Sequence, residues 1–257
     1  MLAIETCGLT RLFDGKPAVD GLDLRVPEGA FYGFLGPNGA GKSTTMRMLT
    51  GLLAPSAGGA LILGRDLSRD GIAVKRLVGS VPDGLALFER LTGAEQLRLS
   101  GQLYGLDRAT ARLRAEELLE ALELADDAGK LVQDYSHGMK KKLALGCALI
   151  HGPRLLFLDE PFEGIDALAV SGIRAMLQDL VSRGQMTIFL TSHVLEVVER
   201  LATHVGIIHR GRLVRQGTLA EIRASGTLEE SFLASVGEER ASPQPLSWLD
   251  GSKAVTG

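Results

Sequence analysis

The 257-residue sequence contains few cysteines, few aromatic residues and no long apolar run. Its two cysteines, Cys7 and Cys147, are too few for a disulfide framework or a metal-binding pattern, and they fit a reduced compartment. Apolar stretches such as residues 155–158 and 186–190 are far shorter than the roughly 18 residues of a membrane-spanning helix. The first residues show no basic leader followed by an apolar core, so we expect no secretory signal.

The sequence also lacks a strong charge of one sign. Its 28 basic and 31 acidic residues leave a formal net charge of −3, so charge alone does not favour nucleic acid as a partner. Hydrophobic residues make up 45% and charged residues 23%, which excludes disorder of the whole chain and indicates a buried core. The length suits one α/β domain, with or without a small inserted subdomain.

Strand-like and helix-like segments alternate along both ends of the chain. The first 35 residues predict strands, because Leu22, Leu24 and Val26 alternate with polar residues. This alternation predicts a mostly parallel sheet. The further predicted strands are 59–63, 77–81, 155–158, 186–190 and 205–208, and the predicted helices are 41–52, 167–183 and 194–201.

Residues 84–152 interrupt this alternation with helical spacing. Two helices are predicted at 93–104 and 107–124, and Ser136 is a suitable N-cap for a third, which Gly152 and Pro153 end. We therefore predict an α/β core formed by residues 1–83 and 153–217 with a helical subdomain at about 84–152 inserted in it. A helical extension at 218–236 and a flexible tail at 237–257 would follow.

A glycine-rich loop lies between a predicted strand and a predicted helix. Gly36-Pro37-Asn38-Gly39-Ala40-Gly41-Lys42-Ser43 matches the pattern G-x-x-x-x-G-K-S/T. Consecutive backbone N–H groups in such a loop, together with the positive end of the helix, form a concave anion site. We expect Lys42 to reach the β- and γ-phosphates, Ser43 to ligate Mg²⁺ and Thr44 to bond the α-phosphate. The alternative is a glycine-rich turn that merely precedes Lys-Ser.

Two carboxylates end the apolar strand at 155–158. Asp159 would be the acid on the Mg²⁺ side if its strand neighbours the strand before the loop. Glu160 can then polarise water as a general base. The alternative is a strand that ends in two solvated acids.

Together these segments resemble a known family. GPNGAGKSTT at 36–45, LLFLDEP at 155–161, GID at 164–166 and TSH at 191–193 resemble the nucleotide-binding subunit of an ATP-binding cassette (ABC) transporter. The resemblance covers about residues 2–217, the expected ATPase domain. It implies a P-loop NTPase (RecA-like) core, an N-terminal antiparallel β-subdomain and an inserted α-helical subdomain.

The segment Tyr135-Ser136-His137-Gly138-Met139-Lys140 occupies the place of the family's signature, typically Leu-Ser-Gly-Gly-Gln. The resemblance implies that two cassettes dimerise head to tail with ATP between them. Ser136 and Gly138 of one copy would contact the ATP held by the phosphate loop of the other, as an anion at a helix N-terminus. His137 and Asp166 would lie at the dimer interface, although Asp166 also suits a simple N-cap of the helix at 167–183.

The resemblance assigns three further positions around the nucleotide. His193 would contact the γ-phosphate and orient the attacking water, and Phe13 would stack on the adenine with Val19 beside it. The alternatives are a histidine at a helix start for His193 and a core position for Phe13.

The sequence departs from the family pattern at several positions. Asp83 stands where a glutamine is usual, and it is either a Mg²⁺ ligand through water or a loop acid without that role. His137 replaces a usual glycine and fits only if its side chain points away from the phosphate. The run Lys140-Lys141-Lys142 predicts a solvated first turn of a helix rather than a nucleic-acid patch.

The resemblance implies an ATPase subunit, using ATP with Mg²⁺, that powers a separate transmembrane permease. It would lie at the cytoplasmic face of the membrane as a peripheral protein, paired with a second copy or a paralogous cassette. Asp83, the Tyr-Ser-x-Gly-Met-Lys segment and the final GRLVRQGTLAEI resemble the exporter branch.

Two other functions are weighed against this one. A soluble cassette ATPase acting on nucleic acid or ribosomes would carry a coiled-coil insert or tandem cassettes and more basic charge, so nucleic acid is not an expected partner. A GTPase or kinase would leave the signature segment and His193 unexplained, and the guanine-reading Asn-Lys-x-Asp pattern is missing.

Overall fold

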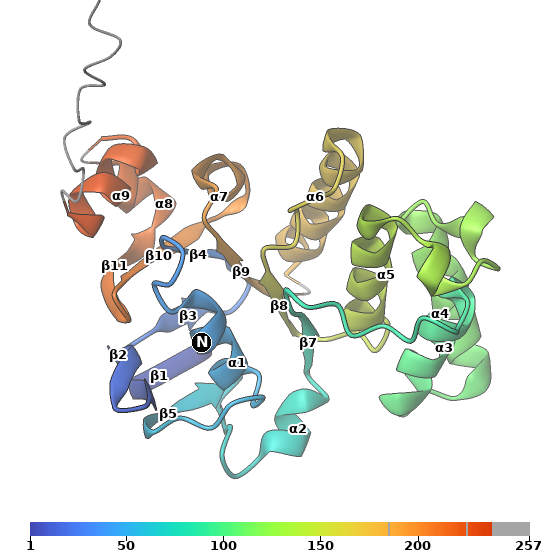
Figure 1. Cartoon of the computed structure of the whole chain (residues 1–257), viewed down its shortest axis with the longest axis horizontal. Coiled ribbons are helices and arrows are strands. Elements are labelled where there is room, and N and C mark those ends of the chain that lie inside the picture. Colours follow the sequence, from blue (N-terminus) through green and yellow to red (C-terminus); the bar gives the residue numbers. More distant parts are fainter. Residues whose placement is uncertain (185, 225, 238–257) are drawn as a thin grey trace, which may run out of the picture.

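Two β-sheets form the centre of the computed structural model, which describes residues 1–184, 186–224 and 226–237 (Figure 1). Among these residues the larger sheet has six strands in the order β11-β10-β4-β9-β8-β7, and only the β10–β11 pair is antiparallel. The mostly parallel sheet predicted from the sequence is therefore confirmed. Its strands are β4 (Phe31–Leu35), β7 (Val78–Val81), β8 (Leu155–Asp159), β9 (Thr187–Ser192), β10 (His204–His209) and β11 (Arg212–Thr218).

The second sheet is antiparallel and joins segments from both sides of the glycine-rich loop. Strand β1 pairs with β2, β3 and β5, and β5 pairs with β6. The antiparallel β-subdomain is thus present, but β5 and β6 follow the loop rather than precede it. Its strands are β1 (Leu2–Phe13), β2 (Lys16–Leu22), β3 (Arg25–Pro27), β5 (Ala57–Ile62) and β6 (Arg65–Asp66).

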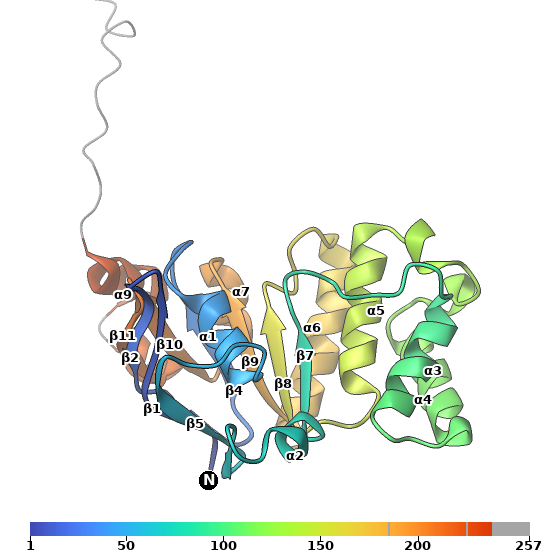
Figure 2. The same ribbon diagram turned by 60° about the horizontal axis from the view of Figure 1, so that its bottom comes forward.

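Three helices lie together at one side of the larger sheet, beyond β7 and β8, in both Figure 1 and Figure 2. They are α3 (Gly93–Leu103), α4 (Arg108–Ala121) and α5 (His137–Leu149), and they begin where Thr92, Asp107 and Ser136 each accept a hydrogen bond from a first-turn N–H. The other helices are α1 (Lys42–Leu49), α2 (Gly71–Lys75), α6 (Ala167–Ser182), α7 (Leu195–Leu201), α8 (Leu219–Arg223) and α9 (Leu228–Val236).

The larger sheet is buried on both faces, as its apolar strands require. Along β8, Leu155 and Phe157 face the core shared with α1 and the antiparallel sheet, whereas Leu156 and Leu158 face the core shared with α5, α6 and α7. This division follows from the two-residue period of a strand. The ring of Phe189 in β9 stacks on Tyr32 of β4, with 5.5 Å between the ring centroids, and meets Phe157 of β8 edge to face.

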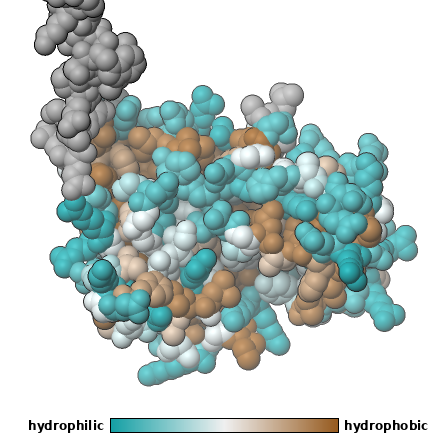
Figure 3. Space-filling model, viewed as in Figure 1, coloured by the Kyte–Doolittle hydropathy of each residue, from teal (hydrophilic) through white to brown (hydrophobic). Residues whose placement is uncertain are grey.

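Most of the surface is polar, with separate apolar patches visible on the face shown in Figure 3. Within the described residues, no helix combines the length and apolar character needed to cross a bilayer. The tail predicted at 237–257 lies outside the described residues apart from Gly237.

Candidate functional site

Strands β4, β7, β8 and β9 run parallel, so their carboxyl ends meet at one edge of the sheet. In open α/β sheets this edge is where ligands bind. The glycine-rich loop follows β4, Asp83 follows β7, Asp159 and Glu160 lie at the end of β8, and His193 follows β9. The fold thus brings together side chains that are more than 100 residues apart in the sequence.

The loop after β4 curls around its own lysine. Gly39 and Gly41 have φ values of 79° and 108°, in the region that favours glycine, and a Cβ on Gly41 would lie 2.6 Å from the Ala18 carbonyl oxygen. The Lys42 side chain is 7% exposed, and its ammonium donates to the carbonyl of Gly36 at 2.8 Å. The loop therefore has the concave, glycine-dependent shape predicted for phosphate binding.

Lys42 carries the positive charge at the centre of the site. Burial lowers the pKa of its ammonium, while the neighbouring carboxylates of Glu160 and Asp159 raise it. The Lys42 Nζ lies 3.9 Å from Glu160 Oε1. This arrangement places one cation between two carboxylates and the loop amides.

Asp159 is buried and reaches the helix that follows the loop. Its Oδ1 accepts hydrogen bonds from Ser43 Oγ at 3.4 Å and from the hydroxyl of Thr191. Strand β8 does not adjoin β4, because β9 lies between them. The neighbouring-strand condition assumed from the sequence is therefore wrong, yet Ser43 and Asp159 still meet because Ser43 lies on α1, above the strand edge.

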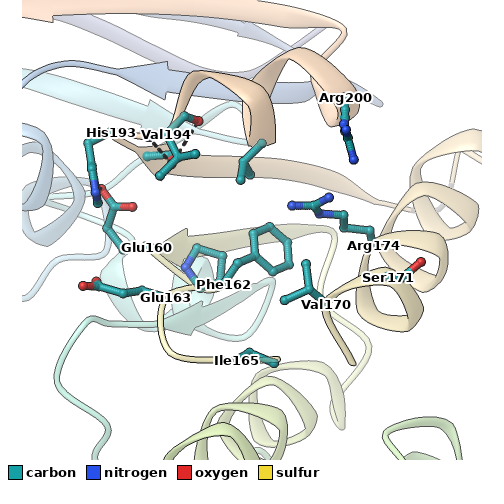
Figure 4. A pocket seen from close by; sticks show the side chains of 13 residues that line it. Glu160, Phe162, Glu163, Ile165, Val170, Ser171, Arg174, His193, Val194 and Arg200 are labelled. Carbon is teal, nitrogen blue, oxygen red and sulfur yellow. Dashed lines mark hydrogen bonds and ion pairs between the residues drawn. The ribbon is translucent and has the colours of Figure 1, made fainter. Parts of the chain in front are cut away.

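Glu160 and His193 form a pair at this edge, and Figure 4 shows their side chains meeting. Glu160 Oε1 lies 2.9 Å from His193 Nδ1. Glu160 has a φ of 46°, a left-handed conformation that is uncommon outside glycine. Its N–H donates to the Thr191 carbonyl and hydroxyl, each at 3.3 Å.

These groups surround a cavity of about 420 Å³. Its size lies in the range of small-molecule sites. Glu163 also lines it, a residue that the sequence analysis did not single out, although it lies in the same loop three positions after Glu160. The lining residues are Ala18, Asn38, Gly39, Gly41, Lys42, Ser43, Thr44, Asp83, Glu160, Glu163 and His193.

A second cavity of about 540 Å³ lies beside the first, and Glu160 and His193 line both (Figure 4). It extends between α6 and α7. The guanidinium of Arg174 lies over the ring of Phe162, 5.4 Å from its centroid.

Comparison with known proteins identifies the family. Residues 19–163 match the family model described as ABC transporter. The chain belongs to this family.

Two relatives of this ABC cassette are named for transport or resistance. It is 41% identical over 223 residues to the daunorubicin/doxorubicin resistance ATP-binding protein DrrA of Streptomyces peucetius, a match that covers 87% of this chain and 67% of that protein. It is 38% identical over 213 residues to the bacitracin transport ATP-binding protein BcrA of Bacillus licheniformis, covering 83% and 69%. A solved ATP-binding subunit of an ABC transporter superimposes with a TM-score of 0.85 at 30% identity, covering 92% of this chain and all 100% of that one.

The cassette is accordingly an ATP-binding subunit that hydrolyses ATP to power a transporter. A GTPase or kinase is excluded by the family, and neither DrrA nor BcrA is named for action on nucleic acid or ribosomes.

The signature segment lies apart from the cavity of its own chain. Ser136 is exposed at the start of α5, where its hydroxyl accepts a hydrogen bond from the Met139 N–H at 3.2 Å. Ser136, His137 and Gly138 do not line the cavity at the glycine-rich loop. The His137 ring lies against Gly164, where an added Cβ would be 2.8 Å from His137 Cδ2. The exposed Asp166 directly precedes α6.

The two positions assigned to the adenine differ in outcome. Phe13, at the end of β1, is 45% exposed, and this exposure excludes a core position. The Arg11 guanidinium lies over the Phe13 ring, and Phe13 does not line the cavity. Val19 is fully buried at 0% exposure and does not line the cavity, so its assignment to the base stays a prediction. Side chains alternate along β2, so the preceding residue, Ala18, lines the cavity instead.

The three consecutive lysines on α5 are not equivalent. Lys140 pairs with Glu89 and Lys142 with Glu123. The prediction of a solvated turn is wrong for Lys141, which is 6% exposed and donates to the backbone carbonyl of Glu160 at 3.0 Å. It is also wrong for Lys142, whose side chain is 11% exposed.

Proposed function

We propose that this cassette binds MgATP between two head-to-tail copies, hydrolyses it with Glu160 as general base, and thereby drives export through a separate transmembrane permease. The observation that carries this proposal is the Glu160–His193 contact of 2.9 Å, in a cavity that also holds Lys42 and the glycine-rich loop. A carboxylate held by an imidazole beside a phosphate-binding loop is suited to accept a proton from an attacking water.

The residues at the edge of the sheet fit a magnesium ion. The hydroxyl of Ser43 and the carboxylate of Asp159 are oxygen donors whose atoms lie 3.4 Å apart, and oxygen is the ligand that Mg²⁺ prefers. Within the described residues no group of three His, Cys, Asp or Glu side chains forms a metal cage by itself. This suits an ion that Ser43 and Asp159 hold together with phosphate oxygens and water, and that would supply charge neutralisation.

The protein groups divide the remaining work. The loop N–H groups and Lys42 would bind and orient the phosphates. Glu160 would take the proton of the attacking water, and His193 would hold the Glu160 carboxylate and contact the γ-phosphate. Asp83 lines the same cavity and would hold Mg²⁺ through a water molecule, in place of the usual glutamine.

The exposure of the signature segment supports a dimer. Ser136 and His137 at the start of α5 are exposed, and they do not line the cavity of their own chain. A helix N-terminus attracts phosphate, so Ser136 and Gly138 would complete the nucleotide site of a second copy or a paralogous cassette. His137 and Asp166 would then lie at this interface.

An apolar groove supports a permease partner at the cytoplasmic face of the membrane. A cavity of about 220 Å³ lies where α1, α2 and β7 meet the end of α3, and Leu52, Val74 and Tyr104 line it. The names of the relatives DrrA and BcrA refer to daunorubicin/doxorubicin resistance and bacitracin transport, so we infer that the cargo is a drug.

Glu160→Gln tests the proposed chemistry. We expect the full-length variant to bind ATP within about twofold of wild type but to hydrolyse it at least about 100-fold more slowly, because the proton acceptor is gone. Size-exclusion chromatography with light scattering should then detect an ATP-dependent dimer. The control is Glu196→Gln, which removes an exposed carboxylate on α7. Wild-type turnover by Glu160→Gln would exclude Glu160 as the base.

A further inference from the structure

Lys141, on α5, is a buried lysine with apolar side chains beside it. Its ammonium donates to the Glu160 carbonyl at 3.0 Å, and within the described residues the structure gives it no ion pair. The small cavity next to it is lined mainly by apolar side chains, including Val81, Leu145 and Leu158. Lysine is almost never fully buried unless its charge is matched, so this burial requires a reason.

The acceptor of this hydrogen bond belongs to a strained residue. Glu160 has a φ of 46°, and a non-glycine residue keeps this strained conformation only when its surroundings hold it there. Thr191 on β9 binds the Glu160 N–H, and Lys141 on α5 binds its carbonyl. Both peptide groups that flank the Glu160 Cα are therefore fixed from outside the loop.

This restraint determines where the Glu160 side chain points. When both flanking peptides are held, the direction of the Cα–Cβ bond is set, and the carboxylate lies 2.9 Å from His193 and 3.9 Å from Lys42. A hydrogen bond from a charged donor is about twice as strong as a neutral one, which suits an ammonium to this task.

The same helix contacts the loop at a second point. The His137 ring, in the first turn of α5, lies against Gly164, while Lys141, one turn later, holds Glu160. The first two turns of α5 thus brace the loop from Glu160 to Asp166. The helix that begins with the signature segment therefore contacts Glu160 and its loop within the same chain.

We propose that Lys141 is a positioning residue for ATP hydrolysis: its buried ammonium ties the Glu160 backbone to the signature helix and so aims the Glu160 carboxylate. The inference rests on the proposed role of Glu160 as general base. Hydrolysis then requires α5 to be seated on the loop, whereas nucleotide binding by Lys42 and the glycine-rich loop does not.

Three variants of the full-length chain test this inference. Lys141→Met removes the donor but keeps an unbranched side chain, Lys141→Arg keeps a charged donor, and Lys142→Met is the matched control on the same helix. We expect Lys141→Met to lower kcat by about 10- to 100-fold, the loss that a small misplacement of a reacting group causes, with ATP affinity within about twofold of wild type. Lys141→Arg should recover kcat to within about threefold, and Lys142→Met should hydrolyse ATP within about twofold of wild type.

A double-mutant cycle separates positioning from general destabilisation. In a Glu160→Gln background, Lys141→Met should lower the residual rate by less than about twofold, because the group that it positions is already removed. Thermal unfolding of each variant shows whether it is folded, and Lys141→Gln takes the place of Lys141→Met if the latter does not fold.

Three results would overturn the inference: equal kcat values for Lys141→Met and Lys142→Met, no recovery with a folded Lys141→Arg, or additive losses in the cycle. If Glu160→Gln is inactive and Lys141→Met is not impaired, only the role of Lys141 is refuted. Wild-type turnover by Glu160→Gln refutes the proposed general base and this inference with it.

Discussion

Lys42 and Lys141 are both buried lysines of this cassette, and the ammonium of each donates to a backbone carbonyl. Lys42 donates to Gly36 in its own loop, and Lys141 donates to Glu160 across the interface between α5 and the core. Burial of Lys42 lowers its pKa, and the carboxylates of Glu160 and Asp159 oppose that shift. Lys42 therefore lies beside the acids, in the position where phosphate would bind.

Asp83 is a residue at which this cassette departs from the pattern of the family. It lines the cavity together with Ser43 and Glu160. If Asp83 holds Mg²⁺ through water, Asp83→Gln should raise the Mg²⁺ concentration for half-maximal hydrolysis by about tenfold, because a neutral amide binds a metal-bound water more weakly than a carboxylate does. The measurement is the ATPase rate against Mg²⁺ at fixed ATP.

The control for this prediction is Asp126→Asn, which removes an exposed carboxylate between α4 and α5. An Asp83→Gln curve that coincides with the wild-type curve would identify Asp83 as a loop acid without a role at the metal.

At the scale of whole elements, a stacked pair joins the α3–α5 helices to the larger sheet. The ring of His151, just after α5, stacks on Tyr104 at the end of α3 with 3.7 Å between centroids. Its Nε2–H donates to the Val78 carbonyl in β7 at 3.1 Å. One histidine therefore contacts both the helical insert and the sheet.

The pKa of His151 makes this junction sensitive to acid. Burial lowers that pKa from the usual 6.5, opposed by the hydrogen bond to Val78. Below pH 6.5, His151 of the unfolded chain binds a proton more readily than His151 of the folded chain. The free energy of unfolding therefore decreases as the pH is lowered, until the pH passes the lowered pKa of the folded state.

His151→Gln should consequently make the free energy of unfolding less dependent on pH between about pH 7 and pH 5. Urea unfolding of wild type and variant at several pH values measures the two slopes. Equal slopes would show that His151 does not contribute to acid sensitivity.

At the scale of the whole molecule, an exposed apolar groove lies beside the junction of the core and the helical insert. Leu52 on its rim is 66% exposed, so an acidic substitution there disturbs no core. Leu52→Asp should prevent co-purification of the permease from solubilised native membranes, because a charge is placed in an apolar contact. ATP affinity should stay within about twofold of wild type.

Leu113→Asp is the matched control, since Leu113 is 58% exposed on α4 and does not line the groove. If Leu52→Asp and wild type co-purify with the same membrane protein, the permease does not dock at this groove.

The local pattern of the sequence was sufficient for the elements and for most of the site. The strand alternation, the cap at Ser136 and the glycine-rich loop at 36–43 each depend on residues close together in the chain, so short-range chemistry determines them. The order of these motifs was enough to indicate the family. The motifs meet in space because parallel strands bring their carboxyl ends to one edge of the sheet.

Long-range packing decided the rest. Only the folded chain shows that β9 separates β4 from β8, that Val19 turns inward while Ala18 lines the cavity, and that Lys141 is buried with its ammonium on the Glu160 carbonyl. Strand order, the face that a side chain takes and the burial of a charge depend on contacts between segments far apart in the sequence. For this cassette the sequence by itself determined the chemistry available at the site, and the tertiary structure decided which groups hold Glu160 in place.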